Sequence, residues 1–364
     1  MKRRDFLKQG LIVSTGIALS SLPTTVRKAI AKNSPWRRFE VITRLEITDT
    51  VGPVRTWVPV PLTRATDYFQ GEPDRWTGNF TSAKVMPYDT YGTGMMFAEW
   101  ATGTNTPVLE VTSRFKTRDR QVDFSSKPNP RVTENQAVLD YFRQPSKLIR
   151  TDGLVATTSK EIVAGKESDV DKAKAIYEWI IDNTFRDPKV KGCGTGDIAT
   201  MLETGYLGGK CADLNALFVG LARAAGLPAR DVYGLRCAAS KEFKSLGRAD
   251  DITGAQHCRA EVYLSGYGWT PVDPADVRKV VLEENAPGEP LALDDPKVMQ
   301  ARAKLFGAWE MNWVPYNYAH DVQLPNSDGP TLGFFMYPQA ETVNGRKDSL
   351  DPKKFTYTIK AKEI

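Results

Sequence analysis

The chain has 364 residues, enough for two modest domains or one large one, and its apolar (41%) and charged (26%) fractions are typical of a soluble globular protein. Its net charge of +5 is carried by residues 1–31, where six Lys and Arg side chains face one Asp, so residues 32–364 sum to zero. We therefore expect no nucleic-acid partner and no anionic membrane surface as a binding partner.

The first 31 residues predict an export signal. Residues 2–8 read Lys-Arg-Arg-Asp-Phe-Leu-Lys, a twin-arginine pattern, and the apolar run 11–22 is too short to span a bilayer. Ala29-Ile30-Ala31 offers small residues for a signal peptidase, and no cysteine precedes Cys193, which excludes a lipoprotein anchor. We expect a periplasmic protein, exported folded through the twin-arginine pathway and not stably inserted in the membrane after signal removal. The alternative is an amphipathic N-terminal helix.

Residues 32–125 are expected to form a small antiparallel β domain. Its strands are predicted where β-branched and aromatic residues gather: 39–45, 54–60, 95–100 and 108–115. Pro59 and Pro61 indicate that the second of these is an edge strand or ends there. This part offers no chemistry, so we expect it to pack or to delimit a substrate. The polar segment 126–131 is a candidate linker.

Residues 131–364 are expected to form the catalytic domain, with its core at 168–280. Ser168 can cap a helix, with Asp171 three positions on, and the apolar residues that follow lie at helical spacing. A central helix is predicted from Cys211 to Ala225. Its apolar residues form one continuous stripe: Leu214, Leu217, Phe218, Leu221, Ala222 and Ala225. Gly226 and Pro228 end it.

Cys211 is therefore predicted to lie at the first turn of this helix. The free N–H groups and the helix dipole there favour a thiolate and can receive an oxyanion. The preceding Gly208 and Gly209 are expected to turn the backbone tightly and to leave room for a substrate. A cysteine nucleophile needs a base, and the chain has only two histidines, His257 and His320.

A hairpin is predicted to bring a carboxylate to the first of these histidines. Residues 257–264 alternate cleanly between polar and apolar, which predicts a half-buried strand with His257 on its polar face. After a turn at 265–268, a second strand returns and ends at Asp273. The start of the first strand and the end of the second lie at the same end of a hairpin, so Asp273 can reach His257.

These segments resemble the bacterial transglutaminase-like superfamily. The resemblance rests on Gly-Lys-Cys-Ala-Asp-Leu-Asn-Ala-Leu-Phe at 209–218, Arg-Ala-Ala-Gly-Leu-Pro-Ala-Arg at 223–230, His-Cys-Arg-Ala-Glu-Val-Tyr at 257–263 and Gly-Trp-Thr-Pro-Val-Asp-Pro at 268–274. It implies a papain-like α+β fold, with a cysteine-bearing central helix packed on an antiparallel sheet. It also implies that Cys211 is the nucleophile, His257 the base and Asp273 its orienting carboxylate. It supplies no side-chain donor for an oxyanion.

Together with the predicted export signal, the resemblance implies an exported, cofactor-free thiol enzyme acting on peptide or protein substrates through a thioester. Water would resolve that thioester in a peptidase or amidase, which we expect, and an amine would resolve it in a cross-linking transglutaminase. A non-catalytic periplasmic binding or assembly protein on the same scaffold is the alternative from another class. The chain contains no EF-hand-type loop.

Asp276, His320 and the other three cysteines are the remaining candidates for the site. Asp276 could orient His257 in place of Asp273, since Asp273 precedes a proline and an Asp in that position often only caps a turn. His320 lies among aromatic residues and is expected to be structural. Cys258 is expected in the core. Cys237 could face it and form a disulfide, while Cys193 could shape the cleft or pair with another cysteine. The four cysteines are 18, 26 and 21 positions apart, which argues against a zinc site.

Overall fold

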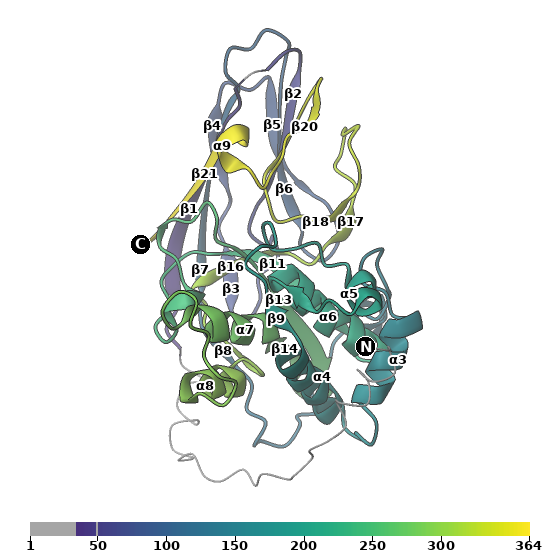
Figure 1. Cartoon of the computed structure of the whole chain (residues 1–364). Helices are drawn as coiled ribbons and strands as arrows, with labels where there is room; N and C mark the ends of the chain where they lie inside the picture. Colours follow the sequence, from purple (N-terminus) through teal and green to yellow (C-terminus); the bar gives the residue numbers. More distant parts are fainter. Residues whose placement is uncertain (1–33, 49) are drawn as a thin grey trace. The chain divides into compact units, whose positions relative to one another are not determined.

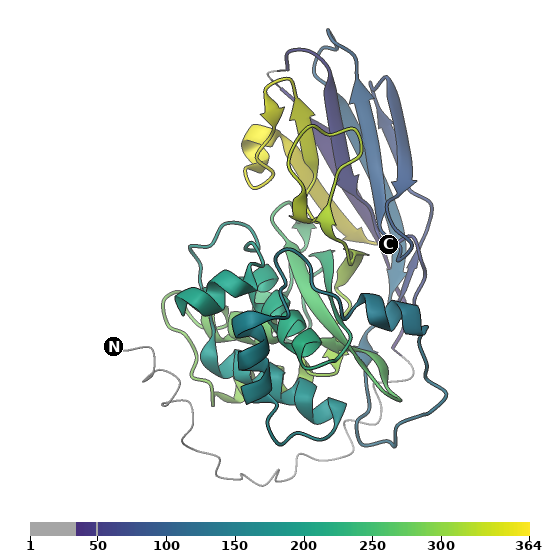
Figure 2. The same cartoon turned by 90° about the vertical axis from the view of Figure 1, so that its right-hand side faces the viewer.

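The computed structural model describes residues 34–48 and 50–364. The predicted export signal and its cleavage site lie outside these residues. Within them, the chain forms β sheets that combine strands from both ends of the sequence and a mixed α/β part between (Figures 1 and 2). No helix of the described part has both the length and the apolar character needed to cross a membrane.

Two antiparallel sheets share one hydrophobic core. The first has the strand order β12 (Asp250–Asp251), β21 (Tyr357–Glu363), β1 (Arg37–Glu46), β7 (Val108–Thr117) and β3 (Phe69–Gly71), with β4 (Arg75–Gly78) also on β7. The second has the order β20 (Gly345–Arg346), β19 (Gln339–Thr342), β2 (Val54–Pro59), β6 (Gly94–Trp100) and β5 (Ser82–Pro87). The four strands predicted in the N-terminal region are thus confirmed. β2 lies between two others and ends at Pro59, so this proline marks a strand end and not a sheet edge.

The C-terminal strands belong to these same sheets. β21 pairs with β1 along seven residue pairs, and β19 pairs with β2. Figure 1 shows the yellow C-terminal strands beside the purple N-terminal ones. The assignment of everything up to residue 364 to the catalytic part is therefore wrong at its C-terminal end. The prediction failed because β1 and β2 pair on both edges, and the sequence of a strand does not show which other strand it pairs with.

A third antiparallel sheet carries the expected hairpin. Its order is β14 (Gly268–Val272), β13 (Gln256–Leu264), β11 (Ala229–Arg236) and β16 (Trp313–Asn317). Most helices pack around one of its faces (Figure 2): α3 (Gly153–Ile162), α4 (Asp169–Asn183), α5 (Ile198–Thr204), α6 (Cys211–Ala224), α7 (Pro274–Glu283) and α8 (Pro296–Lys304). α2 (Gln136–Tyr141) lies on the other face, where Val138 and the C-cap residue Phe142 join the core that contains Trp309 and Trp313. α6 contacts β13 and β11 directly, as expected for the central helix.

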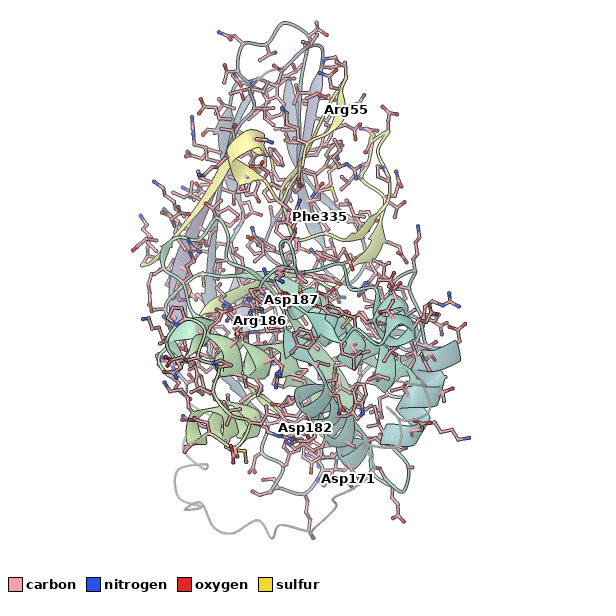
Figure 3. The ribbon with its side chains drawn as sticks, viewed as in Figure 1. Arg55, Asp171, Asp182, Arg186, Asp187 and Phe335 are labelled. Carbon is pink, nitrogen blue, oxygen red and sulfur yellow. The ribbon has the colours of Figure 1, made fainter. Side chains whose placement is uncertain are left out.

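The predicted start of α4 is confirmed in detail. The Ser168 hydroxyl accepts a hydrogen bond of 3.0 Å from the backbone N–H of Asp171, the residue labelled in the first turn of this helix in Figure 3. Short elements complete the fold. They are the 3-10 turn Lys244–Leu246, α9 (Pro352–Phe355) and the strand pairs β9 (Phe185–Arg186) with β10 (Gly208–Gly209), β8 (Arg120–Gln121) with β15 (Ala308–Trp309), and β17 (His320–Val322) with β18 (Leu332–Phe334).

The third sheet is buried on both faces, which corrects the expectation of a half-buried β13. The apolar residues of β13 alternate as predicted and pack under α6. Its polar face is also covered, because Trp309 and Trp313 lie against the guanidinium of Arg259 at 5.2 and 4.8 Å from the ring centroids. Charged side chains on that face are buried in ion pairs, so their presence did not signal contact with solvent.

Candidate active site

Cys211 begins α6, as predicted, and Asp213 organises the start of the helix. The Asp213 carboxylate accepts from the backbone N–H of Lys210 at 2.9 Å, and also from those of Thr195 and Gly196 at 2.9 and 3.0 Å. Acceptor side chains at the third helical position satisfy donors that a helix start leaves free. This one carboxylate therefore holds the loop 192–196 against the residues that carry Cys211.

Two glycines in this region serve close packing. At Gly194, φ is +93° and an added Cβ would lie 1.8 Å from Asp213 Oδ2, so no larger residue fits there. At Gly209, an added Cβ would lie 2.5 Å from the Cβ of Asp213. Gly208 and Gly209 form the short strand β10 beside β9. The expectation that this pair makes a tight turn is therefore wrong, since both residues are extended and Phe185 packs against Gly208.

The hairpin brings His257 to two carboxylates. His257 Nε2 lies 2.8 Å from Asp273 Oδ2 and 3.3 Å from Asp276 Oδ2. Asp273 also caps α7, because its other oxygen accepts from the Asp276 backbone N–H at 3.0 Å. Asp273 therefore both caps α7 and contacts the imidazole of His257. Asp276, the alternative to Asp273, is a second partner of the same Nε2 atom. Nε2 is occupied, so Nδ1 is the ring nitrogen left for Cys211.

Three further residues fix this arrangement, and sequence reasoning missed all of them. Arg236 donates to Asp276 Oδ1 at 2.6 Å. Asn215, one turn after Cys211 on α6, donates to Asp273 Oδ1 at 3.1 Å and to the Cys258 carbonyl at 2.8 Å. Arg259 Nε lies 3.7 Å from Asp273 Oδ2. The amide side chain of Asn215, which lies among apolar residues of α6, was the one sequence signal that could have pointed to this contact.

The electrostatics favour a thiolate–imidazolium pair. Burial would raise the pKa of Cys211, but the neighbouring thiols of Cys193 and Cys258 and the imidazole of His257 outweigh it and lower that pKa well below its ordinary value. Burial and Arg236 would lower the pKa of His257, but Asp276 and Asp273 outweigh them and raise it to about 9. The proton therefore resides on the imidazole over a wide range around neutrality.

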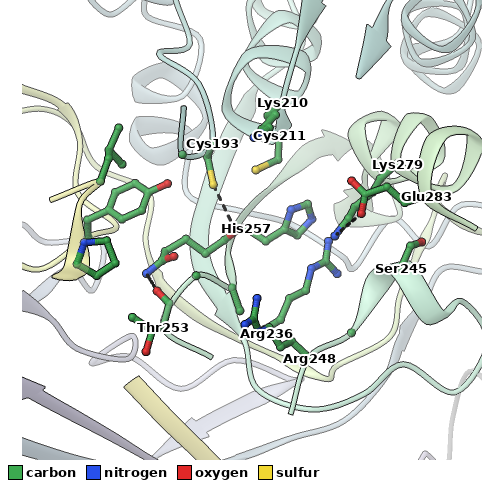
Figure 4. Close-up of a pocket in the computed structure, with 18 of the residues that line it drawn as sticks. Cys193, Lys210, Cys211, Arg236, Ser245, Arg248, Thr253, His257, Lys279 and Glu283 are labelled. Carbon is green, nitrogen blue, oxygen red and sulfur yellow. Dashed lines mark hydrogen bonds and ion pairs between the residues drawn. The ribbon is translucent and has the colours of Figure 1, made fainter. Parts of the chain in front are cut away.

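Cys211 and His257 both line a cleft of about 450 Å³. Figure 4 shows the sulfur of Cys211, the imidazole and Cys193 reaching into this space from different segments. Cys193 therefore contributes to the cleft wall, one of the two roles considered for it, and its Sγ lies 3.3 Å from the Gln256 carbonyl oxygen. Cys211 and His257 are thus brought together at a cavity, and Asp273 is buried behind the imidazole that it contacts. Their catalytic roles remain a prediction.

Two groups of side chains have the chemistry of metal ligands. The Sγ atoms of Cys193, Cys211 and Cys258 lie within 4.8 Å of one another, a soft donor set that the sequence spacing did not reveal. His257, Asp273 and Asp276 form the second group. The carboxylates of the second group are already compensated by the arginines and Asn215. All four cysteines are free thiols, so Cys237 and Cys258 do not form the disulfide that was left open.

The second histidine lies elsewhere. His320 in β17 contacts Tyr233 Oη at 3.4 Å through Nδ1 and Asp231 Oδ2 at 3.3 Å through Nε2. It does not line the cleft of Cys211. Its ring packs edge-on against that of Tyr233, in keeping with the expected structural role.

With this geometry in place, comparison with known proteins defines the class. Residues 156–274, which include Cys211, His257 and Asp273, match the model of the transglutaminase-like superfamily. The chain is also 36% identical over 328 residues to an uncharacterized protein of Haemophilus influenzae, covering 86% of this chain and 87% of that protein. The chain therefore contains a domain of the transglutaminase-like superfamily at residues 156–274.

A solved structure supports the fold. A candidate cysteine protease from Cytophaga hutchinsonii has a TM-score of 0.51 at 17% identity, covering 90% of this chain and 99% of that one. The periplasmic domain of TgpA from Pseudomonas aeruginosa has a TM-score of 0.36 at 15% identity, covering 70% of this chain and 93% of that one. The α+β fold expected from the resemblance, with a cysteine-bearing helix on an antiparallel sheet, is confirmed.

Proposed function

We propose that this chain is an exported cysteine-dependent hydrolase that cleaves amide or peptide bonds through a thioester on Cys211. The observation that carries the proposal is the placement of that thiol at the start of α6, beside an imidazole held by Asp273 at 2.8 Å, on the wall of a cleft. Thiol, imidazole and carboxylate in these positions are the parts that acyl transfer needs.

In the acylation step, the Cys211 thiolate attacks the carbonyl carbon of the substrate amide. The resulting oxyanion needs a hydrogen-bond donor, and the helix start supplies one. The N–H of Ala212 is bound to the Cys193 carbonyl at 2.9 Å, which leaves the N–H of Cys211 itself as the expected donor. The tetrahedral intermediate collapses when the C–N bond breaks, and His257 gives its proton from Nδ1 to the departing amine. The acyl group then remains on sulfur as a thioester.

In the deacylation step, His257 acts in the opposite direction. Neutral after the first step, it takes a proton from water, whose oxygen attacks the thioester carbon. The C–S bond breaks, the acid product leaves and the thiolate–imidazolium pair is restored. Asp273 and Asp276 stabilise the imidazolium in both steps and hold the ring in one tautomer.

The proposed location is the periplasm. It is supported by the twin-arginine pattern at residues 2–8 and the small residues at 29–31. Fusion of residues 1–35 to a reporter that is active only after export would test this part. Export should be lost when Arg3 and Arg4 are both replaced by Lys, and export that survives this change would contradict the proposed pathway.

The enzymatic proposal is tested by trapping the thioester. The full chain and its Cys211→Ala variant are incubated with a pool of peptides, quenched in acid and analysed by mass spectrometry. We expect a hydroxylamine-sensitive acyl adduct on Cys211, and release of acid product in water whether or not a primary amine is added. Absence of an adduct, together with a Cys211 that alkylates with the ordinary pKa of a free thiol (~8.5), would leave a non-catalytic scaffold. Products that contain the added amine would instead indicate a transglutaminase.

A further inference from the structure

The cleft beside Cys211 has a strongly uneven charge. Its cationic lining residues are Arg186, Lys210, Arg236, Lys244, Arg248 and Lys279. Its one carboxylate is that of Glu283. Because residues 32–364 carry no net charge, this excess is a local property of the cleft and not a general property of the protein.

Two features of the fold compensate part of this charge. Arg236 is bound to the buried Asp276 at 2.6 Å, so it serves the His257 cluster. Glu283 is shared by two cations, since Arg186 Nε lies 2.5 Å and Lys279 Nζ 3.5 Å from its oxygens. One carboxylate thus faces two positive side chains. Burial and the neighbouring Arg236 also lower the pKa of Lys279, which shows how closely the positive charges are gathered.

The other cations have no such partner. Within residues 34–48 and 50–364, no carboxylate lies within ion-pair distance of Lys210, Lys244 or Arg248. Lys244 and Arg248 are exposed, and Arg248 is held in place by a hydrogen bond of 2.9 Å from its Nε to the Asp251 carbonyl. These three side chains are free to contact an anion in the cleft.

The positive side chains approach the thiol from different segments. Lys210 directly precedes Cys211, Lys279 lies on α7, and Arg248 follows the 3-10 turn at 244–246. Figure 4 shows them spread around the cleft, with Lys210 beside Cys211 and Arg248 across from it. Arg186, labelled in Figure 3, reaches the cleft from β9, the strand that follows α4. A molecule seated at the sulfur would therefore meet positive charge on more than one side.

We propose that the substrate is an acidic peptide, with carboxylates on the residues that flank the amide attacked by Cys211. This deepens the proposed function and rests on it. A concave site lined by one sign of charge concentrates ligands of the opposite sign, and cation–carboxylate hydrogen bonds fix their orientation. A cavity of about 450 Å³ accommodates a ligand of a few residues.

Stabilisation of the thiolate does not account for these cations. The largest influences that lower the pKa of Cys211 come from Cys193, Cys258 and His257, and none of the cleft lysines is among them. Lys244 and Arg248 are exposed side chains of a loop, where support of the fold does not require them. Binding of an anionic ligand is the role that remains for them.

The first experiment compares two alkylating reagents that differ in charge, iodoacetate and iodoacetamide. Rates at Cys211 are measured by mass spectrometry, and the ratio of the two rates is divided by the ratio for free cysteine. We expect this normalised ratio to be about tenfold higher in the wild type than in Lys244→Gln/Arg248→Gln, and to fall with added salt. Lys84→Gln/Lys160→Gln removes the same charge from exposed sites outside the cleft and should behave like the wild type. Equal ratios in the wild type and the cleft variant would overturn the proposal.

The second experiment identifies the anion. Peptides containing Glu, matched peptides with Gln in its place, and inorganic phosphate are compared as protectants of Cys211 against iodoacetamide. The proposal requires strong protection by the Glu peptides only, and loss of that protection in Lys244→Gln/Arg248→Gln. Equal protection by Glu and Gln peptides, or by phosphate alone, contradicts it. Both experiments need only a reactive thiol and no turnover, so their outcome is separate from failure of the proposed hydrolase activity.

Discussion

Strand β13 carries a buried ionic cluster at each end of the same face. At its beginning, His257 contacts Asp273 and Asp276. Four positions further on, Glu261 is fully buried between Arg120 and Arg230. The guanidinium of Arg230 lies 3.9 Å from the ring centroids of both Trp269 and Tyr318, and that of Arg120 lies 4.0 Å from that of Tyr68.

The two clusters differ in whether their groups can change protonation near neutral pH. Burial would raise the pKa of Glu261, but Arg230 and Arg120 outweigh it and hold that pKa below its ordinary value. Arginine stays charged, so nothing in that cluster changes its protonation near neutral pH. His257 can change its protonation, and it lines a cleft where a substrate can enter. Buried charge is therefore found in both clusters and does not by itself identify the candidate active site. A titratable group that lines a cavity does.

The largest expected effect is at the His257 end. Asp273→Asn keeps the cap of α7, because Asn caps helices as well as Asp does. It removes the negative charge nearest to Nε2, so we expect the rate of amide cleavage to fall by about 10³-fold or more, with Asp276 limiting the loss. Thermal unfolding should change little. An activity within twofold of the wild type would show that Asp276 alone orients His257.

The opposite end should respond in stability and not in chemistry. Glu261→Ala leaves two buried guanidinium groups without a counterion and should cost about 3–5 kcal/mol of the free energy of unfolding. This is measured by urea denaturation, with Glu110→Ala on the surface as the control. The alkylation rate of Cys211 in the folded fraction should stay within about twofold of the wild-type rate, since Glu261 does not contact the cleft. A tenfold change in that rate would mean that the two clusters are coupled.

The pH dependence sharpens the same contrast. The thiolate–imidazolium pair forms as the pH rises through the lowered pKa of Cys211, and it is lost as the pH rises through about 9, where His257 gives up its proton. Cleavage should therefore follow a bell-shaped profile with an alkaline limb near pH 9. Because the pKa of His257 is raised from 6.5, its proton stabilises the fold fully below pH 6.5, and that contribution disappears through about pH 9. An alkaline limb near 6.5 would contradict this cluster, and Glu261→Gln should leave the limb in place.

The smallest effect is expected at Cys193. Cys193→Ala removes one of the groups that lower the pKa of Cys211, so that pKa should rise while the fold is kept. The measurement is the rate of iodoacetamide labelling of Cys211 against pH, with Cys237→Ala as the control, since Cys237 is a buried thiol that does not line the cleft. A downward shift would mean that Cys193 disfavours the thiolate.

The elements that could be predicted are those with a local pattern. The apolar stripe of 214–225 gave α6 and so the place of Cys211 at a helix start. The alternation of β13 and the turn after it gave the hairpin, and the hairpin gave the contact between His257 and Asp273. In each case the periodicity and the turn residues lie within about twenty residues of chain, and over that length the local geometry determines which residues come into contact.

The parts that were missed depend on long-range packing. Arg236 and Cys193 reach the site from β11 and from the loop before α5, and nothing in their local sequence points to His257 or Cys211. The burial of the polar face of β13 was likewise unpredictable, since the tryptophans that cover it lie about fifty residues further along the chain. A polar strand face reads as exposed until its covering segment is known.

The position of β21 has a consequence for biosynthesis. This strand lies between β12 and β1, yet it is made of residues 357–363, which are synthesised long after β1 and β7. During translation, β1 has β7 on one side and an open edge on the other, which invites pairing with other nascent chains. The sheet is completed only after residues 357–363 have left the ribosome. A chain that lacks these residues would retain every residue proposed for chemistry and still lack the strand that covers this edge of β1.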